Sequence, residues 1–203
     1  MVTREQQTYW ILRPDQIAAV TSPTRQEIVD RLAASGPLGA KDLAHALGRR
    51  PTAIYHHVQR LERVGLLKTI PVEGSRGRPA VLYATVAPRM RLARAARLSR
   101  NWRMLRRAAA SAAKQSAEDY GRGFGADRWA TEGSGRNHWF FRVVASPSRS
   151  RLKRINALLD ELAELVWTPD SRPGPTVSLA WFLAPLPSSR RKRRRPTVGR
   201  NAR

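Results

Sequence analysis

The sequence contains no cysteine in its 203 residues. Disulfide bonds, thiolate zinc sites and cysteine nucleophiles are therefore excluded. It also lacks a run of about 18 apolar residues that could cross a bilayer, and the residues after Met1 lack the apolar segment of a signal peptide. We therefore expect a cytoplasmic protein that makes no contact with a membrane.

Acidic residues are scarce as well. The chain has 15 Asp and Glu against 38 Lys and Arg, which gives a formal net charge of +23. A positive potential of this size favours a polyanionic partner, and nucleic acid is the first candidate. The length fits one small domain with an accessory unit, and 14 prolines and 13 glycines indicate loops and linkers between them.

Three short helices followed by a hairpin are predicted within residues 22–86. The first helix begins near Ser22 and Pro23, which favour a helix start, and it ends at Gly36. The second covers about 40–47, and the third opens at Pro51. Two apolar runs, 66–70 and 81–86, then predict β-strands joined by a glycine-rich basic turn.

This order of elements predicts a winged helix-turn-helix domain, in which the third helix, about 50–64, enters the major groove of DNA. Ile54, Val58 and Leu61 share one face of that helix, so the opposite face is free for bases and phosphates. The turn at about 74–80 supplies arginines suited to a narrow minor groove. The expected DNA contacts are Lys41, Arg50, Thr52, Ala53, Tyr55, His56, Gln59, Arg60, Arg76 and Arg78.

The same segments resemble the ArsR-like winged-helix repressors of bacteria. The resemblance lies in Ser22–Ile28, Lys41–Ala44, Tyr55–Leu67 and Arg76–Pro79, and it covers residues 22–86. It implies that the helix carrying Tyr55 is the recognition helix, that the hairpin is a wing, and that a homodimer binds an inverted-repeat operator. The cysteines of the metal-sensing branch are absent, which disfavours metal sensing.

The remaining chain divides by composition. Residues 1–21 are expected to form an N-terminal arm outside the main fold, and the Ala, Arg and Leu of 88–120 predict one long dimerisation helix. Residues 121–135 are expected to be a glycine-rich linker, 136–187 a small β-α-β unit, and 188–203 a disordered basic tail. The fold class is therefore α+β. The spacing of apolar residues on the long helix places Leu98, Trp102, Leu105 and Ala109 in the dimer contact.

Catalysis, cofactors and metals are not expected. No carboxylate pair or activated serine stands out beside His138, as a catalytic site would need. The adjacent histidines His56 and His57 point about 100° apart on a helix, which disfavours a metal cluster with His45. A small-molecule effector is left open. Two alternatives to a sequence-specific regulator also stay open: a nucleic-acid-binding protein of low specificity that uses the arginine-rich helix and tail, and a protein-interaction scaffold.

Overall fold

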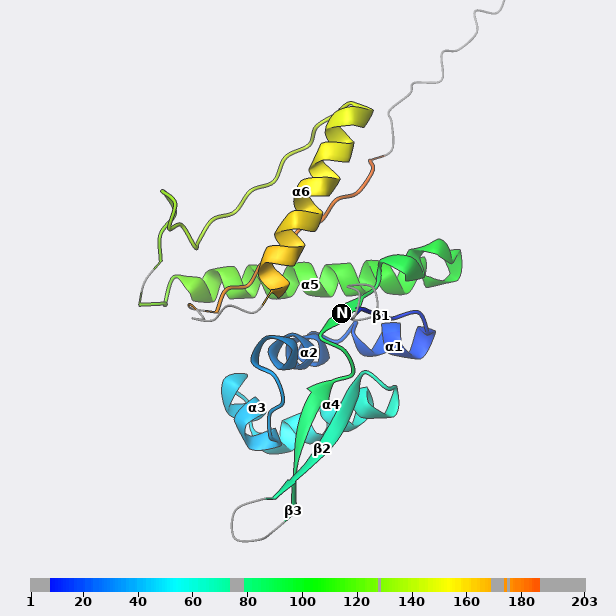
Figure 1. Cartoon of the computed structure of the whole chain (residues 1–203), viewed down its shortest axis with the longest axis vertical. Helices are drawn as coiled ribbons and strands as arrows, with labels where there is room; N and C mark the ends of the chain where they lie inside the picture. The colour runs from blue at the N-terminus through cyan, green and yellow to red at the C-terminus, as the bar shows by residue number, and fades with distance from the viewer. Residues whose placement is uncertain (1–7, 74–78, 128, 169–173, 175, 187–203) are drawn as a thin grey trace, which may run out of the picture.

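A computed structural model of the chain describes residues 8–73, 79–127, 129–168, 174 and 176–186. Three helices and an antiparallel hairpin follow one another in the predicted order (Figure 1). This arrangement is a winged helix-turn-helix, so the predicted α+β fold is confirmed. Its elements are α2 (Pro23–Ser35), α3 (Ala40–Ala46), α4 (Pro51–Arg63), β2 (Leu67–Glu73) and β3 (Pro79–Thr85).

The core lies between α2, α3, α4 and the hairpin. Ile28, Leu43 and Leu61 are completely buried there. Gly48 adopts a φ of 60° in the turn between α3 and α4, and this left-handed conformation favours glycine because it has no Cβ. The backbone N–H of Arg49 then donates to the carbonyl of Ala44 at 2.8 Å, which closes the turn. Apolar spacing and one glycine thus orient α4.

The hairpin is longer than the sequence indicated. Its register pairs Leu67 with Thr85 and Glu73 with Pro79. Leu38, in the loop between α2 and α3, joins the same sheet through two backbone hydrogen bonds with Tyr83, of 3.1 and 2.9 Å. The sheet therefore fixes the hairpin to the helical part of the domain.

The part of the N-terminal arm from Thr8 onward belongs to the main fold, so its predicted place outside that fold is wrong; residues 1–7 lie outside the described residues. β1 (Thr8–Trp10) pairs in parallel with β4 (Arg89–Arg91), and α1 (Pro14–Ala19) follows it. Ile11 and Ile17 are buried in the common core. The apolar cluster of the arm was visible in the sequence, but its pairing with a strand about 80 residues later was not.

The single long helix predicted for 88–120 is also corrected. After β4, the chain forms two short 3-10 helices, η3 (Ala93–Arg97) and η4 (Ser99–Asn101), before α5 (Trp102–Gly123) begins. Pairing with β1 holds β4 extended, and Leu98 is extended between the 3-10 helices. α5 then lies across α1 and α2, on the side of the domain away from the hairpin tip (Figure 1).

The glycine-rich segment 121–135, predicted as a linker, begins inside α5. After it, the chain returns to the C-terminal end of α5 at His138. His138 is buried, stacks on Tyr120 with ring centroids 4.2 Å apart, and has its Nε2 2.8 Å from the Tyr120 carbonyl. A Cβ on Gly123 would lie 2.7 Å from this imidazole, so the close approach requires glycine. Phe124 and Trp129 complete the aromatic cluster.

The predicted C-terminal β-α-β unit contains its helix but not its strands. α6 (Arg149–Trp167) is present, whereas the described residues around 139–144 and 176–183 form no strand. None of the backbone groups in 139–147 and 176–186 makes a hydrogen bond within the described part of the chain. An apolar, β-prone segment becomes a strand only where a partner strand is available, and α6 separates these two segments (Figure 1).

No helix in the described part of the chain combines the length and apolar character needed to cross a bilayer.

Candidate nucleic-acid interface

α4 has two clearly different faces. Ile54, Val58 and Leu61 are all 0% exposed and pack into the core, whereas Tyr55 is 46% exposed and His56 is also exposed. This separation confirms the predicted core face of the helix. A helix held from behind with an outward polar and aromatic face has the geometry required to enter a major groove.

The predicted contact residues gather on and around this outward face. Arg60 is half-buried, and the predicted wing residues Arg76 and Arg78 lie outside the described residues. The exposed members of the set are Lys41, Arg50, Thr52, Ala53, Tyr55, His56 and Gln59.

The C-terminal end of α4 is held by the N-terminal arm. The carbonyl of Val64 accepts hydrogen bonds of 2.9 Å from both Gln16 Nε2 and Arg13 Nη2. Gln16 is only 1% exposed, and its Nε2 also donates to the Tyr9 hydroxyl at 2.7 Å. These bonds satisfy a helix-end carbonyl and fix the direction of α4. Nothing in the local sequence pattern indicated this long-range role.

The start of α4 is anchored by an ion pair. Arg49 Nη2 lies 2.7 Å from Glu27 Oε2, which joins the turn before α4 to α2. Arg122 of α5 approaches the other oxygen of the same carboxylate at 4.0 Å. Arg49 therefore makes an ion pair within the protein although it is exposed, and the neighbouring Arg50 is exposed as well. The set of DNA contacts expected from the sequence contains Arg50 and not Arg49, but nothing in the sequence indicated the pair between Arg49 and Glu27.

Arg25, at the start of α2, also faces inward. Its Nε donates to the carbonyl of Ala19 at 2.5 Å. Burial lowers the pKa of Arg25, and the nearby positive charge of Arg60 contributes. The side chain ties α1 to α2 and lies near the half-buried Arg60.

His57 points between the two faces of α4. Its half-buried ring has a buried Nδ1 with no hydrogen-bond partner among the described residues. Burial lowers the pKa of His57, and the positive charges of Arg25 and Arg49 add to the effect, as does His56. This environment is that of a structural histidine. In the described residues there is no group of three potential metal ligands.

The hairpin lies beside α4. Thr69 of β2 donates from Oγ1 to Glu62 Oε1 of α4 at 3.3 Å. Burial raises the pKa of Tyr83 on β3, with contributions from Tyr55 and Glu62 of α4. These contacts place the hairpin and α4 side by side, as a wing must be placed to contact the duplex next to the recognition helix.

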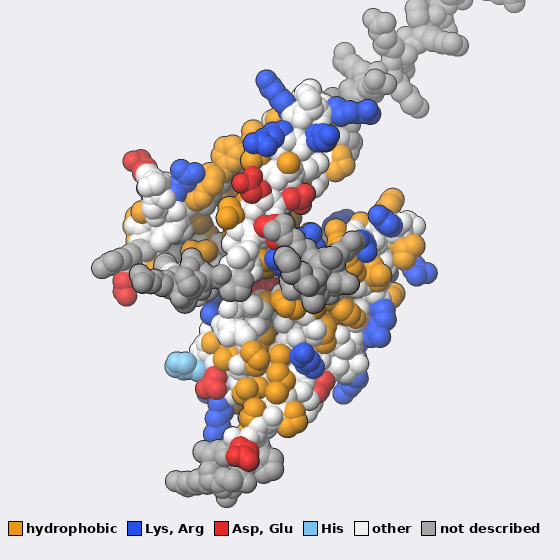
Figure 2. Space-filling view, viewed as in Figure 1, with side chains coloured by type: hydrophobic (Ala, Val, Ile, Leu, Met, Phe, Trp, Pro, Cys, Tyr) orange, Lys and Arg blue, Asp and Glu red, His pale blue; other side chains and the backbone are white. Residues whose placement is uncertain are grey.

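A second basic surface surrounds the start of α5. Trp102 is 62% exposed there, and Leu98 and Ala109 are exposed as well, whereas Leu105 is half-buried against the core. In the same view, Figure 2 shows Lys and Arg side chains along the edge of the molecule next to α5. The exposed arginines of this segment are Arg97, Arg100, Arg103, Arg106 and Arg107.

Comparison with known proteins agrees with the domain assignment. Residues 20–70 match the model of a helix-turn-helix domain family, and this range ends within β2. No curated protein matches the chain.

Several solved structures are similar over much of the chain. Rv1404 from Mycobacterium tuberculosis is 16% identical, with 78% of this chain and 86% of that chain covered and a TM-score of 0.28. The PcaV transcriptional regulator from Streptomyces coelicolor, solved with its natural ligand, is 17% identical, with coverages of 82% and 80% and a TM-score of 0.27. A probable transcriptional regulator from Pseudomonas aeruginosa is 18% identical, with coverages of 74% and 78% and a TM-score of 0.28. These TM-scores are too low to support a conclusion about function. The ArsR-like subtype stays a prediction.

Proposed function

We propose that this protein is a sequence-specific DNA-binding transcriptional regulator. The observation that carries the proposal is the division of α4 into a fully buried face and an exposed face with His56, Tyr55 and Arg50 beside the wing. In the major groove, Arg50 can donate two hydrogen bonds to guanine, His56 can donate to a base acceptor, and Tyr55 can contact a thymine methyl group.

The proposal includes a homodimer on an inverted repeat. A single α4 contacts only a few base pairs, and a two-fold dimer doubles the site at a spacing of about one helical turn. The ArsR-like resemblance supports the same arrangement. Such a regulator would act in the cytoplasm of a bacterium, without a cofactor and without catalysis.

The experiment is selection of bound fragments from a random duplex library by the full chain. The expected result is a palindromic motif bound at least about a thousandfold more tightly than random duplex at one fixed salt concentration. Equal affinity for all duplexes would overturn the proposal. Because phosphate contacts dominate at low salt, affinities for motif and random duplex are compared across a salt series.

A second candidate function is nucleic-acid binding of low specificity. The observation that favours it is the group of exposed arginines around Trp102 at the start of α5, a helix that lies on the other side of α2 from β2 and β3 (Figure 1). Such a surface would bind phosphates without regard to sequence, and the basic residues of 188–203 would add to it. Arg103→Glu separates the candidates, because it should lower affinity for random duplex or RNA strongly only if this surface is the main one.

A further inference from the structure

α6 contacts the rest of the chain through one of its sides. Glu164 Oε1 lies 3.0 Å from Arg89 Nη1 on β4. The guanidinium carbons of Arg89 and Arg91 lie 5.3 and 4.6 Å from the centre of the Trp167 ring. Ala163, next to Glu164, is buried. These contacts fix which side of α6 faces the DNA-binding domain.

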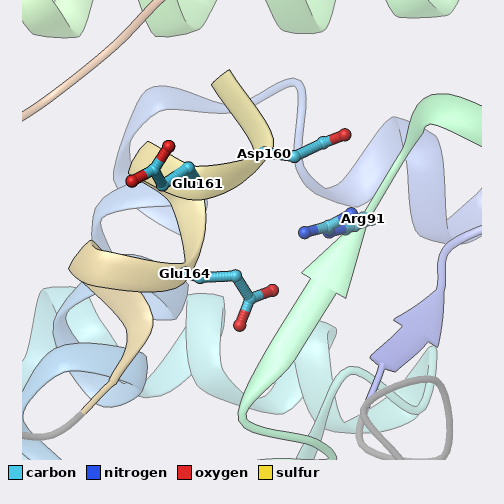
Figure 3. A pocket seen from close by; sticks show the side chains of 4 residues that line it. All are labelled: Arg91, Asp160, Glu161 and Glu164. Carbon is cyan, nitrogen blue, oxygen red and sulfur yellow. The ribbon is translucent and has the colours of Figure 1, made fainter. Parts of the chain in front are cut away.

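The acidic side chains of α6 divide in the same way. Figure 3 shows a pocket lined by Arg91, Asp160, Glu161 and Glu164, in which Asp160 and Glu164 project toward Arg91 and Glu161 points away from that arginine. Glu161, which is exposed, therefore lies at the edge of the side that faces the DNA-binding domain.

An apolar stripe runs along the opposite side of α6. Ile155, Leu158, Leu162 and Leu165 follow at spacings of three, four and three. At about 100° per residue, this stripe lies roughly 170° from the side that carries Glu164. Leu165 is 70% exposed, Leu158 46% and Ile155 36%, whereas Leu162 is half-buried, so the described part of the chain covers the stripe only in part. The pattern is the heptad seam of a helix that packs against another helix.

The two borders of the stripe differ. One border is apolar and consists of Leu152, Leu159 and Val166. The other carries Arg154 and Glu161, which are seven residues apart and so occupy the same heptad position with opposite charges. Charges at such flanking positions select the partner and orientation of a helix pair.

We propose that a second copy of this chain covers the stripe, with the two α6 helices antiparallel about a two-fold axis. With the two-fold axis near residues 157 and 158, Arg154 of each copy faces Glu161 of the partner subunit, whereas a parallel pair would place like charges side by side. In a two-fold pair the same row from each copy runs in opposite directions. The basic residue of one copy then meets the acidic residue of the other, so the row is complementary to itself. The proposal rests on the dimer in the proposed function and names its contact surface.

The surrounding surface is large enough for a stable dimer. Of 24 exposed large hydrophobic side chains in the described residues, 16 belong to 139–186. A stable interface buries about 800 Å² per partner. The aromatic residues Trp139, Phe140, Phe141, Trp181 and Phe182 alone, each 40–76% exposed, would supply on the order of 500 Å². Figure 2 shows hydrophobic side chains gathered beside α6.

Electrostatics disfavour the alternative contact through Leu98 and Trp102. Exposed arginines surround these two residues, so a two-fold contact there would bring like charges together. In contrast, residues 176–186 beside α6 contain no charged side chain.

The test uses two charge-reversal variants of the full chain, Arg154→Glu and Glu161→Arg, in sedimentation experiments. Wild type should be a dimer. Each variant alone should be at least about tenfold weaker in self-association, because its row carries one sign only. An equimolar mixture of the two should form a heterodimer. The double variant with both changes in one chain should recover the homodimer, which shows that the variant chains fold.

Arg107→Glu on α5 is the matched control, with the same change of charge, and it should leave the dimer intact. A monomeric wild type, single variants that both stay dimeric, a mixture that stays monomeric, or a double variant that stays monomeric would overturn the proposal. Loss of the dimer in Arg107→Glu alone would assign the contact to α5 instead.

Binding to a duplex with one half-site of the selected motif separates this proposal from the DNA-binding function. Arg154→Glu should bind the half-site as Arg107→Glu does, because α4 is unchanged. If wild type forms the predicted dimer but binds no half-site in preference to random duplex, the proposed function fails and the α6 contact stands. If half-sites are bound and the charge variants do not behave as described, the α6 contact alone fails.

Discussion

The region before η4 and the region after residue 138 use their apolar residues in opposite ways. All 18 buried members of the main core, from Ile11 to Ala95, lie in the first region. In the second region, the large apolar side chains of α6 and its flanking segments are mostly exposed, and Ala163 is its only buried apolar residue among those described. The comparison teaches that similar hydrophobic spacing forms a core in one place and an exposed apolar surface in the other.

The largest expected difference between the regions is in stability. Leu61→Ala removes a completely buried side chain from behind α4 and should lower the free energy of unfolding by about 2–5 kcal/mol. Leu183→Ala, at a 57% exposed leucine in the second region, should change it by less than about 0.5 kcal/mol. Chemical denaturation of both variants at low protein concentration measures the difference. Equal losses would show that the second region folds around its own core.

The next effect concerns DNA. Arg50→Ala and His56→Ala should each reduce the preference for the selected motif over single-base variants by about 1–3 kcal/mol, because they remove contacts to base edges. Arg78→Ala, or removal of 188–203, should instead lower affinity for every duplex and reduce its salt dependence. Titration of matched duplexes separates the two effects. Uniform loss in all four variants would contradict this division of roles.

A smaller effect is expected where the N-terminal arm holds α4. Gln16→Ala removes a donor to the Val64 carbonyl and should cost about 1–2 kcal/mol of unfolding free energy. The second donor, Arg13, limits the loss. The control is Gln26→Ala, where the amide bonds only to Asp30 on the same helix. Thermal unfolding of both variants measures the difference, and an unchanged Gln16→Ala protein would argue against the arm as a support for α4.

The smallest effect is a pH dependence from His57. Its pKa is lowered in the folded state, so the folded protein binds fewer protons there than the unfolded chain. The corresponding stability is present above the unfolded pKa of about 6.5 and is lost as the pH falls through that value toward the folded pKa. His57→Gln should therefore reduce the drop in Tm between about pH 7.5 and about pH 5.5. His45→Gln, at an exposed position of α3, serves as the control, and an equal reduction in both variants would contradict the assignment to His57.

The sequence was sufficient for the parts of the fold that depend on local spacing. Pro51 and the stripe of Ile54, Val58 and Leu61 predicted both the start and the buried face of α4, because helix periodicity alone decides which side chains share a side. Gly48 marked the turn for a similar local reason. The position of the exposed recognition face followed from these residues.

The features that were missed depend on contacts distant in sequence. The pairing of β1 with β4 and the bonds from Gln16 to Val64 join residues 48 or more positions apart, and no local pattern encodes them. The predicted helix over 88–120 was wrong before Trp102 because strand pairing overrode helix propensity. The strands expected around α6 were wrong because a strand requires a partner.

The most direct test of the central claim, that the outward face of α4 recognises DNA sequence, is a cycle of protein and base substitutions. Wild type, Arg50→Ala, His56→Ala and Arg103→Ala are each titrated with the selected duplex and with single-base variants of it at one salt concentration. We predict a coupling energy of about 1–3 kcal/mol between an α4 residue and one base pair, and none for Arg103. Coupling for Arg103 but not for Arg50 or His56 would contradict the claim.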